Sequence, residues 1–231
     1  MSVTIKTLMN FAGFEKLTPV ELEAAAQVAQ TASFQRHQVF YAQGDSAPGL
    51  IALKTGMVKL YRQSRGKTQI LNILGAGDIF GAETLFDTIT CPYTAAAITS
   101  GTAVTITPEA LQGLLAQHPA LLNMLLELLW GRLRDFTTLV QNLAFEDVAT
   151  RLSFALMQLA RIDSETDHDG DAVVIRRRLS QQELANLVGT SREVIYRTLK
   201  KFEEQGFIQV SAQYIIIHDF DAFSRQVRFS D

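Results

Sequence analysis

Three charged side chains in the last quarter of this sequence have the chemistry to read the edges of base pairs. They are Arg192, Glu193 and Arg197, and all three are expected on the exposed side of one helix. An arginine can donate a fork of hydrogen bonds to guanine O6 and N7, and a glutamate can accept one from cytosine N4. A solvated helix with an ordinary Arg–Glu pair would contain the same residue types, so the surrounding elements must decide between the two interpretations.

The residues from 179 to 208 predict two short helices with a glycine turn between them. Ser180 can cap the first helix, and Glu183, three residues later, can complete a capping box. Gly189 stands where the turn needs a residue that tolerates positive φ, and Ser191 can cap the second helix. This arrangement is a helix-turn-helix of the kind that places its second helix in the major groove of DNA.

Two neighbouring features favour the DNA-binding interpretation. Alternating apolar residues at 207–210 and 214–217 predict a β-hairpin, so the module is winged. A basic run at 176–178 and the lysines that end the second helix supply the positive charge that phosphate contacts need. The predicted DNA-binding residues are Ser180, Gln181, Ser191, Arg192, Glu193, Tyr196, Arg197, Lys200 and Lys201.

Composition limits the class of protein. A chain of 231 residues with 47% hydrophobic residues can bury two cores, and its net charge of −3 argues against non-specific coating of nucleic acid. The single cysteine, Cys91, excludes a disulfide framework within the chain and an iron–sulfur cluster held by several of its cysteines. With no targeting or membrane segment in the sequence, we expect a protein of the reducing cytosol.

The rest of the chain predicts an α+β protein. Thr18 and Pro19 begin a capped helix, and the region 34–106 alternates short apolar runs with glycine turns, which indicates a jelly-roll barrel or sandwich. A helical section follows from Pro108, with a break near His118 and Pro119. We expect an effector-sensing domain at 1–145, with a dimerisation helix at about 119–143, and a DNA-binding domain at 146–231. The acidic run 163–171 is expected to be a loop.

Apolar residues recur along this dimerisation helix at alternating spacings of four and three, which is the heptad seam of a coiled coil. The seam residues are Leu122, Leu126, Leu129, Leu133, Phe136, Val140 and Leu143. An amphipathic helix packed on its own barrel is the alternative, and we expect Leu121, Leu125, Leu128 and Trp130 to take that role. Because apolar residues occupy more than one face, the helix is predicted to pack on both its own domain and a second copy of the chain.

The order of these elements resembles the CRP/FNR superfamily of bacterial transcription regulators over nearly the whole chain. The motifs that carry the resemblance are Gly75-x-Gly77-Asp78-x-Phe80-Gly81 with Leu85-Phe86, Asn142-Leu143-Ala144-Phe145-x-Asp147, and Ser191-Arg192-Glu193-x-x-x-Arg197. The resemblance implies a double-stranded β-helix similar to cyclic-nucleotide-binding domains, followed by the winged helix-turn-helix. It also implies a homodimer on palindromic double-stranded DNA with TGTGA-like half-sites, and RNA polymerase as a further partner.

The resemblance implies an effector pocket as well, formed by Gly81, Ala82, Glu83, Tyr93, Thr94, Arg132, Phe136 and Thr137. Members of the family that bind cAMP have a glutamate after the loop glycine and later an Arg-Ser pair. Here Ala82 follows Gly81, Tyr93-Thr94 replaces the Arg-Ser pair, and Phe136-Thr137 replaces the Thr-Ser pair that reads adenine. A buried phosphate without its positive partner would lose several kcal/mol, so a cyclic nucleotide is disfavoured.

Other effectors and functions stay open at this point. Haem is one candidate ligand of the barrel. Its axial ligands would come from Cys91 or from the scattered His37, His118, His168 and His218, of which His37 lies nearest the barrel region. The N-terminal cysteine cluster of FNR is absent.

A metal-dependent cupin-type enzyme would need clustered histidines, and no HxH pair occurs, so we expect no enzyme. A cyclic-nucleotide-responsive regulator is the other alternative. No pattern distinguishes activation from repression.

Overall fold

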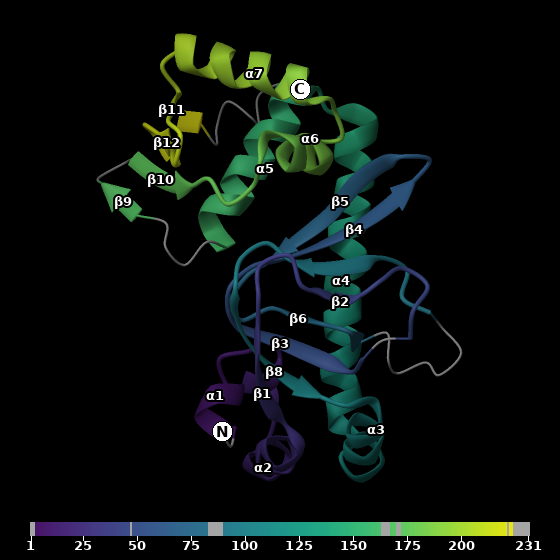
Figure 1. Cartoon of the computed structure of the whole chain (residues 1–231). Helices are drawn as coiled ribbons and strands as arrows, with labels where there is room; N and C mark the ends of the chain where they lie inside the picture. The colour runs from purple at the N-terminus through teal and green to yellow at the C-terminus, as the bar shows by residue number, and fades with distance from the viewer. Residues whose placement is uncertain are drawn as a thin grey trace. The chain divides into compact units, whose positions relative to one another are not determined.

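The computed structural model describes residues 3–46, 48–82, 90–162, 167–169, 172–220 and 222–223, with the backbone alone at 167–169. The chain divides into two compact units, one of residues 1–62 with 73–136 and the other of residues 63–72 with 137–231 (Figure 1). Glu83, Leu85 and Phe86, which the sequence motifs include, lie outside the described residues. The expected domain boundary at 145/146 stays a prediction.

Unit 1 begins with short helices: α1 (Ile5–Leu8), the 3-10 helix η1 (Phe14–Lys16) and α2 (Pro19–Val28). The Thr18 amide donates to the Glu21 carboxylate at 2.7 Å, and the Glu21 amide donates to the Thr18 hydroxyl at 3.4 Å. This reciprocal pair satisfies two amides that a helix start leaves without partners. The predicted helix start at Thr18 and Pro19 is confirmed.

Two four-stranded sheets form the β-roll, and their strands lie in unit 1 except for residues 63–72, which belong to unit 2. One has the order β1 (Gln30–Phe34), β8 (Gly101–Ile106), β3 (Leu50–Thr55) and β6 (Ile79–Phe80), and the other has the order β2 (Val39–Tyr41), β7 (Thr94–Ala97), β4 (Val58–Ser64) and β5 (Lys67–Leu74). Neighbouring strands run antiparallel, for example β3 on β8 with Ala52 opposite Val104, and β4 on β7 with Leu60 opposite Ala95. The predicted β-roll is confirmed.

Close backbone approach explains one glycine of the barrel motif. Gly81 has φ +86, and a Cβ there would lie 2.1 Å from the Gly49 carbonyl oxygen. Any other residue would therefore force the two segments apart. Gly81 thus allows β6, which ends at Phe80, to leave the sheet beside the loop before β3.

Two helices follow the sheets: α3 (Pro108–Gln117) and α4 (Ala120–Phe145), separated at His118 and Pro119 as predicted. Helix α4 belongs to unit 1 up to residue 136 and to unit 2 beyond it. Figure 1 shows α2 and α3 at the same end of the barrel. The core there joins the lead-in helices, β3, β8, α3 and α4, and its buried residues include Leu8, Phe11, Phe14, Leu22, Leu50, Val104, Leu111, Leu121 and Leu125.

The inward face of α4 agrees with the sequence prediction except at Trp130, and Leu129, which was predicted for the seam, also packs against the core of its own domain. Leu121 and Leu125 are buried in the core, and Leu128 packs against it. Trp130, by contrast, is 65% exposed, so its predicted role in this core is wrong. It follows Leu128 by two positions, about 200° around a helix, and therefore points away from the face that Leu128 uses.

Unit 2 contains α5 (Val148–Ile162), α6 (Gln181–Val188), α7 (Arg192–Glu204) and a sheet of order β11 (Ile208–Val210), β12 (Tyr214–Ile217), β10 (Ala172–Arg176) and β9 (Asp167–Asp169). The predicted hairpin at 207–217 is confirmed. The loop predicted for the acidic run is wrong at Asp167–Asp169, because backbone pairing with β10 outweighs the low strand propensity of aspartate. Residues 163–166, 170 and 171 of that run lie outside the described residues.

Candidate DNA interface

The helix-turn-helix is fixed by the four residues that the sequence pointed to. The Glu183 amide donates to the Ser180 hydroxyl at 3.1 Å, and the Ser180 amide donates to the Glu183 carboxylate at 3.0 Å, which closes the predicted capping box on α6. Gly189 ends α6 with φ +74, and a Cβ there would lie 2.6 Å from Leu143 Cδ2. The Ser191 hydroxyl accepts from the Val194 amide at 3.3 Å and caps α7.

The inner face of α7 holds it against the rest of unit 2. Ile195, Leu199 and Phe202 are buried, and Val194 is half-buried. The Val210 amide donates to the Glu203 carboxylate at 2.8 Å, which ties the last turn of α7 to β11. Figure 1 shows α7 with α5, α6 and the wing strands on one side of it. The packing therefore determines which face of α7 is presented to solvent.

That outer face contains most of the predicted DNA-binding residues. Arg192, Glu193, Tyr196, Arg197, Lys200 and Lys201 are all exposed. At about 100° of rotation per residue, Arg192, Tyr196, Lys200, Glu193 and Arg197 fall within an arc of about 140°. Gln181 of α6 lies beside this face, because the Arg192 Nε donates to its side-chain oxygen at 3.5 Å.

The electrostatics of α7 keep its glutamate charged. The pKa of Glu193 is lowered, first by a hydrogen bond from its own backbone amide, then by the Ser191 hydroxyl and the charges of Arg192 and Arg197. An ionised carboxylate at neutral pH can only accept hydrogen bonds, which is the property that pairing with a base amino group requires. The Lys200 ammonium lies 5.6 Å from the centre of the Tyr196 ring, within the range of a cation–π contact.

One arginine of the predicted basic run supports the wing. The Arg177 amide donates to the Gln213 carbonyl at 2.8 Å, and its guanidinium Nη1 donates to the Ser211 carbonyl at 2.7 Å. The Ser211 hydroxyl in turn accepts from the Tyr214 amide at 2.9 Å. Arg177 therefore shapes the hairpin turn, and Gln213, which the sequence analysis did not single out, is exposed at its tip.

Arg151 is a further residue that the sequence analysis missed. Its Nε donates to the Val188 carbonyl at 2.9 Å, and its Nη1 donates to the Glu146 carbonyl at 2.7 Å. One guanidinium therefore satisfies a carbonyl at the end of α6 and another just beyond the end of α4, both of which lack an intrahelical partner. The sequence signal for this role is weak, because a single arginine on an amphipathic helix is usually solvated.

Two of the predicted effector-pocket residues, Tyr93 and Phe136, belong to a row of aromatic rings in unit 1. Tyr93 is only 2% exposed, and its ring centre lies 6.1 Å from that of Tyr41 and 6.2 Å from that of Phe136 on α4. Phe80 follows at 6.1 Å from Tyr41, and the row continues through Phe40 to Phe34 with separations of 5.3 and 5.2 Å. These separations suit edge-on and tilted aromatic packing.

The remaining pocket candidates lie in different surroundings. The Thr94 hydroxyl accepts from the Gln43 amide at 3.0 Å, Ala82 is buried, and Thr137 is exposed in unit 2. The Arg132 guanidinium donates to the Ile79 carbonyl at 3.3 Å and lies 3.6 Å from the Asp135 carboxylate.

The neighbouring Asp78 carboxylate of the barrel motif is largely buried. Burial raises its pKa, against the opposing effects of the Gly75 amide and the Arg132 charge. The Gly75 amide donates to this carboxylate at 2.8 Å and so closes the turn before β6.

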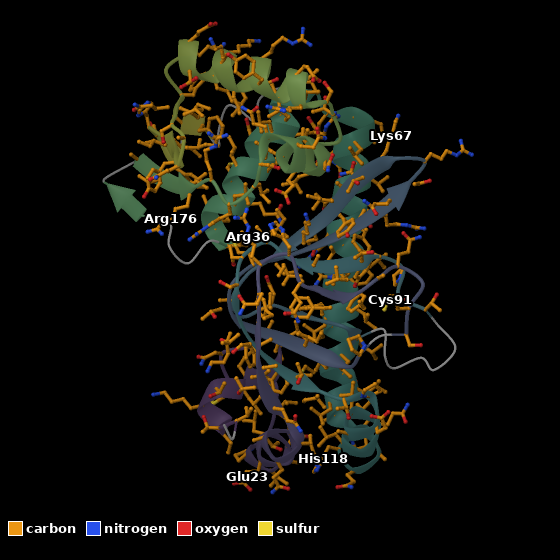
Figure 2. All side chains as sticks on the ribbon, viewed as in Figure 1. Glu23, Arg36, Lys67, Cys91, His118 and Arg176 are labelled. Carbon is orange, nitrogen blue, oxygen red and sulfur yellow. The ribbon has the colours of Figure 1, made fainter. Side chains whose placement is uncertain are left out.

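Two of the candidate haem ligands, Cys91 and His118, lie in different parts of unit 1 (Figure 2). Figure 2 shows Cys91 on the barrel and His118 at the helical end of unit 1. Cys91 is buried, and His37 is exposed in the turn after β1 with φ +68. Among the described residues, no three histidine, cysteine, aspartate or glutamate side chains come close enough together to hold a metal ion. Within the same part of the chain, no helix has the length and apolar content to cross a membrane.

Comparison with known families gives two matches that lie one after the other along the chain. Residues 31–118 match the cyclic nucleotide-binding domain, and residues 150–225 match the Crp-like helix-turn-helix domain. The first match covers most of the β-roll with α3, and the second covers α5 to the wing.

Relatives match over most of their length. The chain is 31% identical over 217 residues to the CRP-like cAMP-activated global transcriptional regulator of Mycobacterium tuberculosis, covering 93% of this chain and 96% of the relative. It is 29% identical to the cyclic AMP receptor protein of Thermus thermophilus, covering 85% and 88%.

Solved structures show the same fold. The c-di-GMP responsive global regulator CLP of Xanthomonas campestris superposes with a TM-score of 0.73 at 25% identity, over 87% of this chain and 99% of that protein. A putative crp/fnr-family regulator from Eubacterium rectale gives 0.75 at 21% identity, over 95% and 99%. The chain is thus related to DNA-binding transcription regulators, and it belongs to the CRP/FNR superfamily.

Proposed function

We propose that this protein is a homodimeric transcription regulator that reads palindromic DNA with TGTGA-like half-sites through α7. The observation that carries this proposal is the exposed face of α7, where two arginines flank an ionised glutamate on a helix capped at Ser191. RNA polymerase is the further partner that a regulator of this family would need.

Each residue has a role in the proposed complex. Arg192 and Arg197 donate to guanine O6 and N7, and Glu193 accepts from cytosine N4; each good pairing discriminates by about 1–3 kcal/mol. Contacts with phosphates or flanking groups are assigned to Ser180, Gln181, Ser191, Lys200 and Lys201. Phosphate contacts fix the register of α7 on the duplex, whereas base contacts select the sequence.

The outer face of α4 supports a second copy as the partner. Five of the predicted seam residues, Leu122, Leu126, Leu133, Val140 and Leu143, are between 38% and 66% exposed. Leu129 and Phe136 are half-buried, and the exposed Trp130 widens the same apolar stripe. A two-fold pair of such helices would bury this stripe and present two α7 helices about 34–36 Å apart, one turn of DNA.

The aromatic row argues against a cyclic nucleotide as the effector. Tyr93 occupies the position where cAMP-binding members have their arginine, and it is buried between Tyr41 and Phe136. A tyrosine cannot neutralise a buried phosphate. A cAMP-responsive regulator is the second candidate, favoured by the match to the cyclic nucleotide-binding domain and by the names of the relatives.

Selection of binding sites from random duplex DNA by the purified protein tests the proposal. We expect a palindrome with TGTGA-like halves, and loss of that selection for Arg192→Ala and Arg197→Ala. Arg36→Ala, which removes an exposed arginine from the turn after β1, is the matched control and should select the wild-type site. Unchanged selection by the α7 variants would refute the base-reading roles, and a rise in DNA affinity on titration with cAMP would favour the second candidate.

A further inference from the structure

An aromatic side chain stands among the charged residues on the outer face of α7. Tyr196 is 49% exposed, although it lies on a helix whose apolar residues Ile195, Leu199 and Phe202 are buried. The packing of unit 2 therefore does not account for this ring. An exposed aromatic group on a binding face is more often a contact than a core residue.

The position of Tyr196 places it inside the proposed reading surface. It follows Arg192 by one turn and lies about 40° from it around the helix axis, between Arg192 and the pair Glu193 and Arg197. The Lys200 ammonium, one turn further, lies 5.6 Å from the centre of the tyrosine ring. This contact favours a defined ring orientation and leaves the ammonium exposed beside it.

In the major groove, an apolar ring has one distinctive target. The 5-methyl group of thymine is the apolar group that a base presents there, and it is recognised by apolar contact rather than by hydrogen bonds. The lysine beside the ring suits the adjacent phosphate, because an exposed ammonium binds phosphate as a point charge.

We propose that Tyr196 is a specificity-determining residue that packs its ring against the 5-methyl group of one thymine in each half-site, while Lys200 binds a neighbouring phosphate. The inference rests on the proposed DNA-reading function of α7 and adds to it the recognition of a methyl group. It also assigns the contact to the ring of Tyr196 and not to its hydroxyl.

Replacement of single thymines by deoxyuridine tests this assignment, because it removes the methyl group and keeps the base pairing. Each thymine of the selected palindrome is replaced in turn, symmetrically in both half-sites, and affinity is measured by fluorescence anisotropy with the full-length protein. Losing one buried methyl contact corresponds to about fourfold in affinity per half-site. We expect that loss at one thymine position for the wild type.

Variants of Tyr196 and Lys200 show which side chain causes the methyl effect. In Tyr196→Ala the methyl effect at that thymine should disappear, with the response to deoxyuridine at every other position unchanged, and in Tyr196→Phe the effect should remain. Lys200→Met should weaken binding to all sequences and lower the salt dependence by about one phosphate contact per copy, with the methyl effect retained. Because Tyr196 is half exposed, circular dichroism should show that these variants fold as the wild type does.

The outcomes separate this inference from the proposed function. A selected palindrome without methyl dependence, or with the same dependence in Tyr196→Ala, would refute the role of Tyr196 and leave the reading by Arg192 and Arg197 intact. Loss of the methyl effect in Tyr196→Phe or in Lys200→Met would also contradict the assignment to the ring. Failure to select any site would overturn the proposed function, and the inference with it.

Discussion

Shortening one residue of the apolar stripe on α4 should weaken self-association by a predictable amount. Leu126 is 52% exposed in a single copy, so about half of its side chain remains to be buried by a partner. Full burial of a leucine contributes about 1.5–3 kcal/mol, so this half contributes about 1 kcal/mol per copy. Two-fold symmetry doubles the loss in Leu126→Ala to about 2 kcal/mol, which corresponds to about a 30-fold rise in the dimer dissociation constant.

Trp130 makes this equilibrium visible in fluorescence. It is the only tryptophan of the chain and is 65% exposed in a single copy, four residues after Leu126. Diluting the protein from above to below the dimer dissociation constant should therefore shift the emission of Trp130 to longer wavelength and increase its quenching by acrylamide. Sedimentation equilibrium gives the same constant independently.

A control variant and a second α4 variant test whether the effect is specific to the apolar stripe on α4. Val20→Ala shortens an apolar residue of similar exposure, 64%, on α2, away from the seam, and should leave the dissociation constant unchanged. Adding Val140→Ala to Leu126→Ala should weaken the dimer further. An unchanged constant in both α4 variants, or a protein that remains monomeric at all concentrations, would contradict the assignment of this stripe to a second copy.

Three further predictions concern the elements that hold α7 in place. Gly189→Ala should destabilise unit 2 by at least about 1–2 kcal/mol in urea unfolding, because of its left-handed backbone and the contact with Leu143; equal stability would refute the steric argument. Asp147→Ala should cost about 1 kcal/mol at pH 7, because the Asp147 carboxylate accepts from the Thr150 amide at 2.8 Å and caps α5. That amide lowers the pKa of Asp147 below its ordinary 3.8. The stabilisation is therefore complete above 3.8 and disappears as the pH falls through the lowered pKa. If the wild type remained more stable than Asp147→Ala in acid below that pKa, the capping role would be contradicted. Arg151→Ala should lose about 2–3 kcal/mol of stability, because it removes the hydrogen bonds to the Val188 and Glu146 carbonyls. Arg151→Lys should lose part of that amount. Wild-type stability in either variant would contradict the capping of both carbonyls by Arg151.

The sequence predicted most of the fold because local signals agree with the tertiary structure in most elements. The caps at Thr18, Ser180 and Ser191 and the turn at Gly189 are short-range features that depend on a few neighbouring residues. Such positions can be recognised without knowing the rest of the molecule.

The features that sequence reasoning missed depend on distant contacts. Strand β9 forms because β10 offers backbone partners, although its residues Asp167–Asp169 have low strand propensity. Trp130 is a different case, because its offset of about 200° from Leu128 follows from helix periodicity and could have been read from the sequence. The two carbonyls that Arg151 caps lie 5 and 37 positions away along the chain, so no local pattern could reveal that role.

The central claim, that two copies of α7 read a palindrome together, is tested most directly by changing the spacing of the half-sites. Affinity is measured on the selected palindrome, on a single half-site, and on a palindrome with five extra base pairs at its centre, about half a turn of DNA. We predict one dimer per palindrome and a large loss of affinity on the other two duplexes. In both of them a dimer can place only one α7 in a half-site, because the second half-site is either absent or turned to the opposite side of the duplex. Equal affinity for all three duplexes would contradict the claim.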